Sequence, residues 1–421
     1  MRVLRLTPFF HHPDALSWPS AYDSLGGMQI QTWRQAVWLA EAGISQHVLT
    51  IGFPGLPRLR QLHPNLTVQR SCLPMHSIRS ELSGLVGLTY AWAAATLAKL
   101  PRLRAEGRID VIHAHFDGQI PAIFMAWAAP KIMARPLVIT VHCSRLAVYQ
   151  PRSRLDRWQH GFARWLERRA LAGSSAALVL TRRTASVVAD AAPRVMVLPD
   201  IVDTDRFHRP ETGEIDAFRT RYGLRRRTVG YVGRIAKEKG WRHLVTLAKT
   251  LREDGVGLLV VGDGPQRAQF DAAVAAHCLG DWVTVTGFIA NSDVPAAMAA
   301  CEVLVMPSDY EEFGGASIEA FATGTPVVAF AVGGLAEIVG GADARLLVEP
   351  GDVDSLIART RAVLAGEIVI DRASLVDRVA RDFAPNAVQG GLVELYGELA
   401  SRARRLGVEH RPVDAVRQHK S

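Results

Sequence analysis

The sequence predicts an α/β protein of two doubly wound domains, each with a parallel sheet covered on both faces by helices. The chain has 421 residues, which is more than one hydrophobic core normally spans. Short runs rich in Val, Ile and Leu alternate with longer stretches of helical spacing, which is typical of parallel sheets. A stretch rich in charge, Pro and Gly, residues 199–227, separates these runs into two series. We expect one domain on each side of it.

The short apolar runs are the predicted strands. The first series comprises Arg2–Leu6, Gln46–Ile51, Leu66–Arg70, Val111–Ala114, Leu137–Val141, Ala177–Leu180 and Val195–Leu198. The second series comprises Thr228–Val232, Gly257–Val261, Val283–Thr286, Val303–Met306, Pro326–Phe330 and Leu346–Val348. Ligands of such sheets bind beyond the carboxyl ends of the strands, so the informative residues should directly follow strands.

The predicted domains are residues 1–205 and 206–384, with their ligands in one cleft that both domains face. Residues 385–421 are predicted to form a helical segment that returns to the first domain, because the pattern over Arg372–Leu406 is helical and polar.

The composition is that of a globular protein, with 48% apolar and 21% charged residues. The formal charge is +8, and only six of the 49 basic residues are Lys. A basic balance permits nucleic acid, an anionic membrane or a phosphate-bearing small molecule as partner. No run of five or more like charges occurs, which favours arginines spread over a solvated surface. We therefore expect no nucleic-acid partner.

The four cysteines, which lie far apart, form no Cys-x-x-Cys pair, so neither a zinc site nor a disulfide framework is indicated. The first residues read as a strand and lack the features of a signal peptide. The apolar stretch Gln119–Pro130 is too short to span a bilayer. We expect a cytoplasmic protein without stable membrane insertion.

A glycine pair, Gly26-Gly27, lies in the loop after the first predicted strand and before the amphipathic run Gln31–Ala42. Paired glycines let the backbone approach a ligand, and the following helix N-terminus offers N–H donors to an anion. An ordinary loop pair remains the alternative.

Histidines close two strands of the first domain, in His113-Ala-His115-Phe-Asp117 and in Thr140-Val-His142. Alternation along a strand puts the rings of His113 and His115 on one face, where they could bind a metal. No third ligand has a suitable spacing, so we favour a site without metal. His142 is either a satisfied core histidine or, from its place after a strand, a residue of the cleft.

Basic residues follow the first strand of the second domain, in Val232-Gly-Arg-Ile-Ala-Lys-Glu-Lys-Gly240. Arg234 and Lys239 could neutralise the developing charge of a leaving diphosphate without a metal. A solvated basic turn is the alternative. The next strand is followed by Gly262-Asp-Gly-Pro265, which lacks the third glycine of the dinucleotide fingerprint and favours a structural turn.

The most specific stretch is Ser308-Asp-Tyr-Glu-Glu-Phe-Gly-Gly-Ala-Ser-Ile-Glu-Ala320, which runs from a strand into a helix. Its glycines allow the helix N-terminus to approach an anion. Glu311 and Glu319 could form an acid–base pair or could accept hydrogen bonds from sugar and ribose hydroxyls. A glutamate that only complements the helix dipole would account for Glu311 or Glu312 but not for Glu319.

Two further patterns have structural interpretations that we favour. Asp203-Thr-Asp205 matches a manganese-binding Asp-x-Asp, but it lies in the connection between the domains. The stretch Arg154–Arg169 carries five apolar side chains at helical spacing, which could lie on an anionic membrane or pack on the sheet. We expect packing for Leu155, Trp158, Phe162, Trp165 and Leu166.

Taken together and in this order, the motifs resemble glycosyltransferase family 4, the group 1 retaining enzymes of the GT-B fold, over nearly the whole chain. The resemblance implies that Arg234 and Lys239 hold the donor diphosphate, that Glu311 meets the sugar and Glu319 the ribose, and that His142 lies by the sugar. Further donor contacts are implied for Gly26, Gly27, Ile289, Gly314, Gly315, Ala316 and Ser317. The family usually has Glu-Gly-Phe-Gly where this chain has Glu311-Glu312-Phe-Gly, and often Pro-Asn-Gly-Val-Asp where it has Pro199-Asp-Ile-Val-Asp203.

Three stretches resemble a narrower group, the 2-deoxystreptamine glycosyltransferases of aminoglycoside antibiotic pathways. They are Gly52–Arg58, Thr140–Pro151 and Glu238–His243. This resemblance implies transfer of N-acetylglucosamine or glucose from its UDP form to an aminocyclitol. Because that acceptor carries protonated amines, a carboxylate should offset the protein's positive charge. Asp117, with His115 beside it, and Asp23 are the candidates, and a cap of the following helix is the alternative role of Asp117.

We expect the transfer to retain anomeric configuration and to need no metal. The acceptor would attack the anomeric carbon on the same face from which the diphosphate departs.

A nucleotide-sugar hydrolase or epimerase of the same architecture is one rival function. A nicotinamide dehydrogenase is disfavoured by the missing glycine, and a regulator that only binds sugar nucleotides is disfavoured by the intact set of Arg234, Lys239, Glu311 and Glu319.

Overall fold

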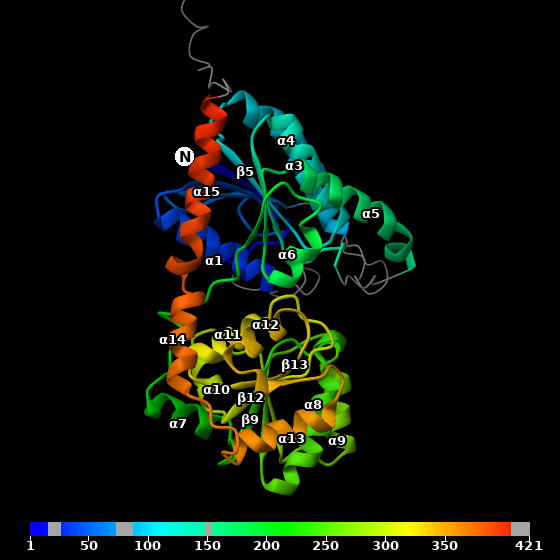
Figure 1. Cartoon of the computed structure of the whole chain (residues 1–421), viewed down its shortest axis with the longest axis vertical. Helices are drawn as coiled ribbons and strands as arrows, with labels where there is room; N and C mark the ends of the chain where they lie inside the picture. The colour runs from blue at the N-terminus through cyan, green and yellow to red at the C-terminus, as the bar shows by residue number, and fades with distance from the viewer. Residues whose placement is uncertain (16–26, 73–86, 148–153, 406–421) are drawn as a thin grey trace, which may run out of the picture. The chain divides into compact units, whose positions relative to one another are not determined.

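The computed structural model describes residues 1–15, 27–72, 87–147 and 154–405, which fall into two compact units (Figure 1). The first unit is Met1–Pro199 together with the chain from Gln389 onward, and the second is Asp200–Val388. The sequence analysis places the corresponding boundaries after residues 205 and 384. Among the described residues, no helix is long and apolar enough to cross a membrane.

The sheet of the first unit has, within the described residues, eight strands in the order β3-β4-β2-β1-β5-β6-β7-β8. They are β1 (Arg2–Leu6), β2 (Ser45–Ile51), β3 (Leu59–His63), β4 (Leu66–Ser71), β5 (Val111–Phe116), β6 (Leu137–Val141), β7 (Ala176–Val179) and β8 (Val195–Val197). All neighbours pair in parallel except β3 and β4. The strands predicted in the first series are confirmed, with small differences at their ends.

The antiparallel strand β3 was not predicted. Its residues are exposed or half-buried, so no apolar run marks it in the sequence. It forms the edge of the sheet beside β4, and a polar edge strand lacks the buried positions on which strand prediction depends.

Helices cover both faces of the first sheet. They are α1 (Gly27–Glu41), α3 (Gly87–Ala105), α4 (Ile120–Met133), α5 (Arg154–Ala172), α6 (Arg182–Val188) and α15 (Pro385–Arg405). Leu49 of β2 packs in a large core with α3, α4 and α5, whereas its neighbour Val48 packs in a smaller core with α1. Because successive strand residues point to opposite faces, the two cores lie on opposite sides of the sheet.

Helix α5 buries a different set of side chains from the one predicted. Trp158, Phe162 and Trp165 are 80%, 55% and 49% exposed, so the expectation that they pack on the sheet is wrong. Leu166 is buried as expected, and the side chain of Leu155 lies outside the described part. The residues of α5 in the core are two alanines and two leucines, Ala163, Leu166, Ala170 and Leu171. The two alanines let the backbone of α5 lie close to its neighbours, and the aromatic rings on the other side of the helix stay exposed.

The second sheet has, in the described part of the chain, six parallel strands in the order β11-β10-β9-β12-β13-β14. They are β9 (Thr228–Val232), β10 (Gly257–Val261), β11 (Val283–Gly287), β12 (Val303–Met306), β13 (Val327–Phe330) and β14 (Leu347–Val348), as the second series predicts. The helices around it are α7 (Thr212–Arg221), α8 (Trp241–Leu251), α9 (Arg267–Ala276), α10 (Val294–Ala299), α11 (Gly315–Ala322), α12 (Gly333–Ala342), α13 (Val353–Leu364) and α14 (Arg372–Asp382).

Helix α7 lies within the stretch that the sequence analysis assigns to the domain boundary. It starts in a capping box of Glu211 and Glu214, and it buries Phe218. Only this one side chain of the helix is buried, so the stretch lacks the apolar periodicity by which a helix is predicted.

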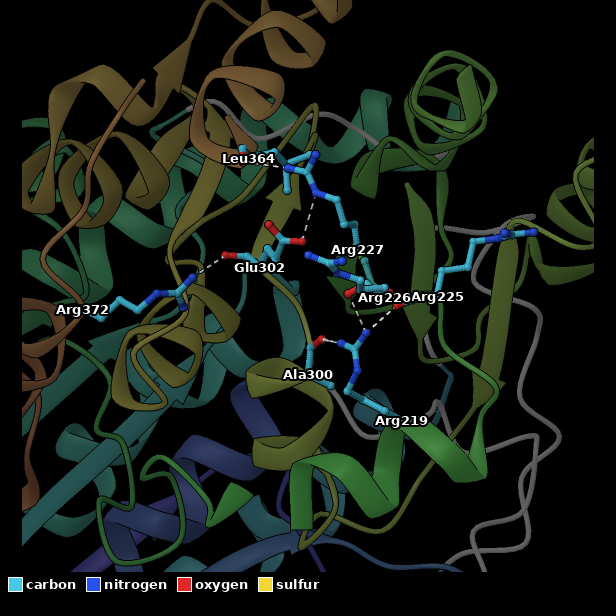
Figure 2. A network of polar contacts seen from close by, with 9 residues as sticks. Arg219, Arg225, Arg226, Arg227, Ala300, Glu302, Leu364 and Arg372 are labelled. Atoms are coloured by element: carbon cyan, nitrogen blue, oxygen red, sulfur yellow. Dashed lines mark hydrogen bonds and ion pairs between the residues drawn. The ribbon is translucent and has the colours of Figure 1, made fainter. Parts of the chain in front are cut away.

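Arginine side chains tie α7 and its neighbours to the segments that lead into the central strands β9 and β12 (Figure 2). The Arg219 guanidinium donates to the main-chain oxygens of Ala300, Arg225 and Arg226. Arg227 donates to Glu302 at 3.3 Å and to the Leu364 oxygen at 2.6 Å. A further arginine, the first residue of α14, donates to the main-chain oxygen of Glu302 at 2.9 Å. A planar guanidinium can serve several carbonyls at once, which a lysine cannot.

Replacing Arg219 by Met should therefore destabilise the second unit. We expect a loss of about 1–2 kcal/mol in the free energy of unfolding, because three carbonyl oxygens lose a charged donor. Arg226→Met is the matched control, since its exposed side chain makes no hydrogen bond or ion pair with the described residues and should change stability by less than about 0.5 kcal/mol. Equal values for the two variants in urea unfolding would contradict a structural role for the Arg219 side chain.

Candidate functional site

The loop after β9 is held close to the loop after β10 in the second unit. Main-chain hydrogen bonds join Gly233 N to Val261 O and Ile235 N to Asp263 O. A Cβ atom on Gly262 would lie 2.1 Å from the Gly233 oxygen, and one on Gly264 would lie 2.3 Å from the Ile235 oxygen. The two glycines are therefore needed for this contact, which supports the interpretation of Gly262-Asp-Gly-Pro265 as a structural turn.

The predicted cations Arg234 and Lys239 are both presented by this loop, and each is paired with a carboxylate. Arg234 donates to Glu238 at 2.7 Å, with both side chains about 40% exposed. Lys239 is paired with Glu311, at 24% and 12% exposure. The structure thus brings together two of the predicted donor-site residues, Lys239 and Glu311, from segments that are far apart in the sequence.

The charges of this cluster shift the pKa values of two neighbouring side chains, Glu238 and Tyr231. Burial acts to raise the pKa of Glu238, but hydrogen bonds from Arg234 and the backbone, with the charges of Arg234 and Lys239, lower it overall. Burial raises the pKa of the Tyr231 hydroxyl, and the negative charges of Glu311 and Glu238 raise it further. Tyr231 therefore stays protonated and donates to the Arg234 oxygen at 2.8 Å, which fixes the main chain beneath the cation.

The loop that carries Glu311 is fixed by close backbone contacts. Gly240, with φ of 68°, lies so near Pro307 that a Cβ would come within 1.8 Å of its oxygen. Gly333, with φ of 48°, lies against the main chain of Glu311, where a Cβ would be 1.5 Å from the oxygen. Gly334 N also donates to this oxygen at 3.3 Å. The start of α12 thus determines where the main chain of Glu311 runs.

The predicted anion-binding residues lie where the resemblance implies, at the start of α11. Gly314 is its N-cap with φ of 97°, and Gly315 and Ala316 open the helix. The Ser317 hydroxyl and the Ser317 amide both donate to the Gly314 oxygen, at 2.6 and 2.9 Å. Glu319 is half-buried in the same helix.

One departure from the family pattern has a hydrogen-bond partner: Glu312, which replaces a glycine, accepts a hydrogen bond from the Tyr310 hydroxyl at 2.7 Å. Asp203, where the chain matches the family pattern, accepts from the Arg206 amide at 3.2 Å, as in a turn. Ile289 is half-buried two residues after β11, which ends at Gly287. Among the described residues, no group of three or more His, Cys, Asp or Glu side chains could hold a metal ion.

In the first unit, Gly27 is the exposed first residue of α1. Gly26 and Asp23 lie outside the described residues. Asp117 is half-buried and accepts from the Gln119 side chain at 3.3 Å. Helix α4 has Gln119 and not Asp117 as its N-cap residue. The alternative role of Asp117 as the N-cap of this helix is therefore wrong.

The three histidines form one buried cluster. The rings of His113 and His115 lie 4.1 Å apart, on one face as predicted, and the His142 ring stacks on His115 at 5.4 Å. Nε2 of His115 contacts an Arg5 nitrogen at 2.6 Å, and its Nδ1 contacts His142 Nε2 at 3.1 Å. Both ring nitrogens of His115 are thus occupied, which leaves it no free atom for a direct contact with an acceptor molecule.

Two members of this cluster were missed by sequence reasoning. Arg5 is completely buried in β1, and Tyr396 of α15 contacts Nδ1 of His113. An arginine inside the apolar run Arg2–Leu6 was the available signal, because a buried charge requires partners. No pattern near Tyr396 predicts its contact with His113 of β5, because the two residues are 283 positions apart in the sequence.

Burial keeps all three histidines neutral. It lowers the pKa of His113 and His115 well below 6.5, with neighbouring histidines and Arg5 adding to the effect. Burial, and then the charge of Arg5, lowers the pKa of His142 to about 3. His142 is therefore an uncharged hydrogen-bonding group throughout the neutral range.

Two matched glycine substitutions test the backbone contact at Glu311. Gly333→Ala and Gly351→Ala both place a Cβ at positive φ, but only the first meets another atom, since Gly351 has open space around it. Gly333→Ala should displace Glu311 and weaken binding of a sugar nucleotide at least tenfold. Gly351→Ala should only lower the melting temperature modestly, through backbone strain, and leave binding unchanged. Titration calorimetry decides, and equal affinities would refute the contact.

Stability should fall as the pH is lowered through the histidine range. A histidine in the unfolded chain binds a proton below about pH 6.5, whereas His142 in the folded state stays neutral down to about 3. Replacing His142 by Gln should thus reduce the slope of unfolding free energy between pH 5 and 6.5 by up to about 1.4 kcal/mol per pH unit. The exposed His277, changed to Gln, is the control, and identical slopes for both variants would refute the neutral assignment.

Comparisons with known proteins agree with this architecture. Residues 25–206 match the family model Glycosyltransferase Family 4, and residues 214–381 match Glycosyl transferases group 1. The sucrose-phosphate synthase of Thermosynechococcus elongatus superposes with a TM-score of 0.78 at 24% identity, covering 95% of this chain and 99% of that one. The HepE structure from Anabaena with UDP and glucose has a TM-score of 0.69 at 18% identity, covering 95% and 100%. These likenesses confirm the predicted fold.

Relatives found by sequence have a higher identity to this chain than these solved structures. The chain is 46% identical over 381 residues to the 2-deoxystreptamine N-acetyl-D-glucosaminyltransferase of Streptomyces fradiae, covering 88% of this chain and 89% of that protein. It is also 46% identical over 346 residues to the 2-deoxystreptamine glucosyltransferase of Streptomyces kanamyceticus, covering 80% and 89%. With the family models matching both units, these relatives confirm the family that the ordered motifs indicate: the chain belongs to the group 1, family 4 glycosyltransferases.

Proposed function

We propose that the protein transfers N-acetylglucosamine or glucose from its UDP form to 2-deoxystreptamine, with retention of anomeric configuration, as an early step in making an aminoglycoside antibiotic. The observation that carries the proposal is 46% identity to two enzymes named for this acceptor, over 80% or more of this chain. The paired Lys239 and Glu311 support it, because they present both a cation and a carboxylate where a sugar diphosphate would need them.

The donor is proposed to bind to the second unit. Its diphosphate would take Arg234 and Lys239 as partners, together with amide groups at the start of α11, where the helix dipole favours an anion. When Lys239 turns toward phosphate, the side-chain oxygens of Glu311 can accept hydrogen bonds from sugar hydroxyls. Glu319 would accept from the ribose and Ile289 would pack beside the base.

The acceptor is proposed to bind to the first unit. Asp117 would oppose a protonated amine of the aminocyclitol, with Asp23 as the second candidate and Gly26-Gly27 beside the donor phosphates. His142 would donate to the transferred sugar. Because both His115 nitrogens are occupied by Arg5 and His142, we assign His115 to the support of His142. The four cysteines are free thiols, which fits a reducing compartment such as the cytoplasm.

The test is to incubate the purified protein with UDP-N-acetylglucosamine or UDP-glucose, with and without 2-deoxystreptamine, and to follow UDP release and product mass. The proposal expects UDP release that depends on the acceptor, with a product heavier by one sugar. Release without acceptor would favour a hydrolase. Binding of the sugar nucleotide without turnover would favour a regulatory protein, and transfer only to other small acceptors would refute the assignment of 2-deoxystreptamine.

Turnover should survive removal of divalent cations. The reason is that Arg234 and Lys239 supply the positive charge that a metal would otherwise bring to the leaving diphosphate. Rates are compared before and after dialysis against EDTA, with added manganese as the second arm. Loss of activity that manganese restores would contradict this prediction and would assign a metal role to Asp203 and Asp205.

Two conservative substitutions should separate ribose from sugar recognition. Glu319→Gln should weaken both UDP and the UDP-sugar, whereas Glu311→Gln should weaken the UDP-sugar far more than UDP. A charge-assisted hydrogen bond contributes on the order of 1.5–3 kcal/mol, so each loss should be at least tenfold in affinity. Calorimetry with both ligands measures this. Should Glu311→Gln weaken UDP as much as UDP-sugar, its assignment to the sugar is wrong.

A further inference from the structure

A buried guanidinium lies at the base of the histidine cluster. Arg5 is completely buried, and its hydrogen-bond partners among the described residues are all uncharged. They are the side-chain oxygens of Gln35 at 2.7 Å and Gln46 at 3.0 Å, and Nε2 of His115 at 2.6 Å. A guanidinium has five N–H donors and no acceptor, so each of these partners must accept.

This requirement fixes the protons of a hydrogen-bond chain that starts at Arg5. In this first chain, Nε2 of His115 accepts from Arg5, so Nδ1 of His115 carries the proton and donates to Nε2 of His142 at 3.1 Å. His142 must then carry its own proton on Nδ1. A second chain, which does not include Arg5, joins the Tyr396 hydroxyl to Nδ1 of His113 and Nε2 of His113 to the Thr140 hydroxyl at 2.7 Å.

The first chain ends at the most exposed of the three rings. His115 is 1% exposed and His113 is completely buried, whereas His142 is 8% exposed. Nδ1 of His142 has no hydrogen-bond partner among the described residues. Arg5 therefore sets the direction of every bond in the chain, through His115, as far as the His142 ring.

We propose that Arg5 is a positioning residue that holds His142 as the neutral Nδ1–H tautomer, so that His142 can only donate a hydrogen bond to the bound substrate. The proposal rests on the glycosyl transfer proposed above and assigns the direction of one contact in it. With Nε2 committed to His115, His142 cannot take the proton of the acceptor hydroxyl. When the acceptor oxygen bonds to the anomeric carbon and the bond to UDP breaks, that proton must pass to the departing phosphate oxygen instead.

The direction of the hydrogen bond from His142 Nδ1 also determines which substrate groups can bind there. An Nδ1–H donor favours a substrate oxygen that offers a lone pair and disfavours a group that can only donate, such as a protonated amine. A sugar bearing an ammonium group at the position facing His142 is therefore excluded, whereas a hydroxyl or an acetamide oxygen is accepted.

Nitrogen NMR of the protein labelled at histidine tests the tautomer without any assay of activity. His142→Gln identifies the His142 signals. The expected result at pH 7 is a protonated Nδ1 and an unprotonated Nε2, unchanged between pH 5 and 8. A protonated Nε2, or a ring that becomes doubly protonated in this range, would overturn the proposal, even if Arg5 variants fail to fold.

A double-mutant cycle tests whether Arg5 acts through His142. Arg5→Met should lower kcat about tenfold, because the transition state loses the contribution of about one hydrogen bond, with little change in acceptor KM. In a His142→Gln background the same substitution should have almost no further effect. An undiminished loss in that background would show that Arg5 only supports the fold, and would overturn the proposal.

Thr140→Val is the matched control. It removes the acceptor at the end of the second chain and leaves the chain from Arg5 to His142 intact. It should lower stability by an amount comparable to Arg5→Met while leaving kcat and the His142 NMR signals unchanged. If the wild-type protein transfers no sugar to 2-deoxystreptamine, the proposed function fails, but the tautomer of His142 is still measured and decides this inference separately.

Discussion

The second unit depends on close approach between main-chain segments at the ends of its strands. Gly240, Gly262, Gly264 and Gly333 each lie where a Cβ would fall within about 2.3 Å of a carbonyl oxygen. Because these contacts join backbone to backbone, they leave little freedom in the loops that carry Lys239 and Glu311. The ion pair between those two side chains follows from this arrangement, since each is held by a loop that cannot shift on its own. Preorganisation of this kind lowers the cost of binding a charged ligand.

The arginine-rich composition has a structural use in this protein. Several guanidinium groups donate to main-chain carbonyl oxygens at helix and strand ends, as Arg219 and Arg227 do, and as Arg378 does to the oxygen of Ile338. The sequence analysis assigned the arginines to a solvated surface. Composition does not reveal which arginines meet carbonyls, because these contacts join segments that are distant in the sequence. An exchange of arginines for lysines would therefore remove specific bonds while leaving the net charge unchanged.

The sequence predicted the features whose cause is local. Buried parallel strands such as β9 and β12 form continuous apolar runs, and the glycines around Glu311 mark the turn into α11, so both were predicted at their observed positions. The misses have a common origin in contacts that no local pattern encodes. Strand β3 is polar because it lies at an edge, α7 buries only Phe218, and the aromatic side chains of α5 are exposed although their spacing is that of a packed helix. Likewise, His113 and His115 were predicted on one face, but their partner Tyr396 could not be.

Tyr396 also constrains the order in which the protein can be completed during synthesis. The second unit, Asp200–Val388, is contiguous, so all of its strands have left the ribosome before α15 is finished. The first unit is discontinuous and takes its last helix from beyond Gln389. Until Tyr396 arrives, His113 lacks one of its hydrogen-bond partners, although every strand of that unit was made long before. The N-terminal half of the chain therefore emerges first but reaches its final packing last, with one buried histidine incompletely paired during the interval.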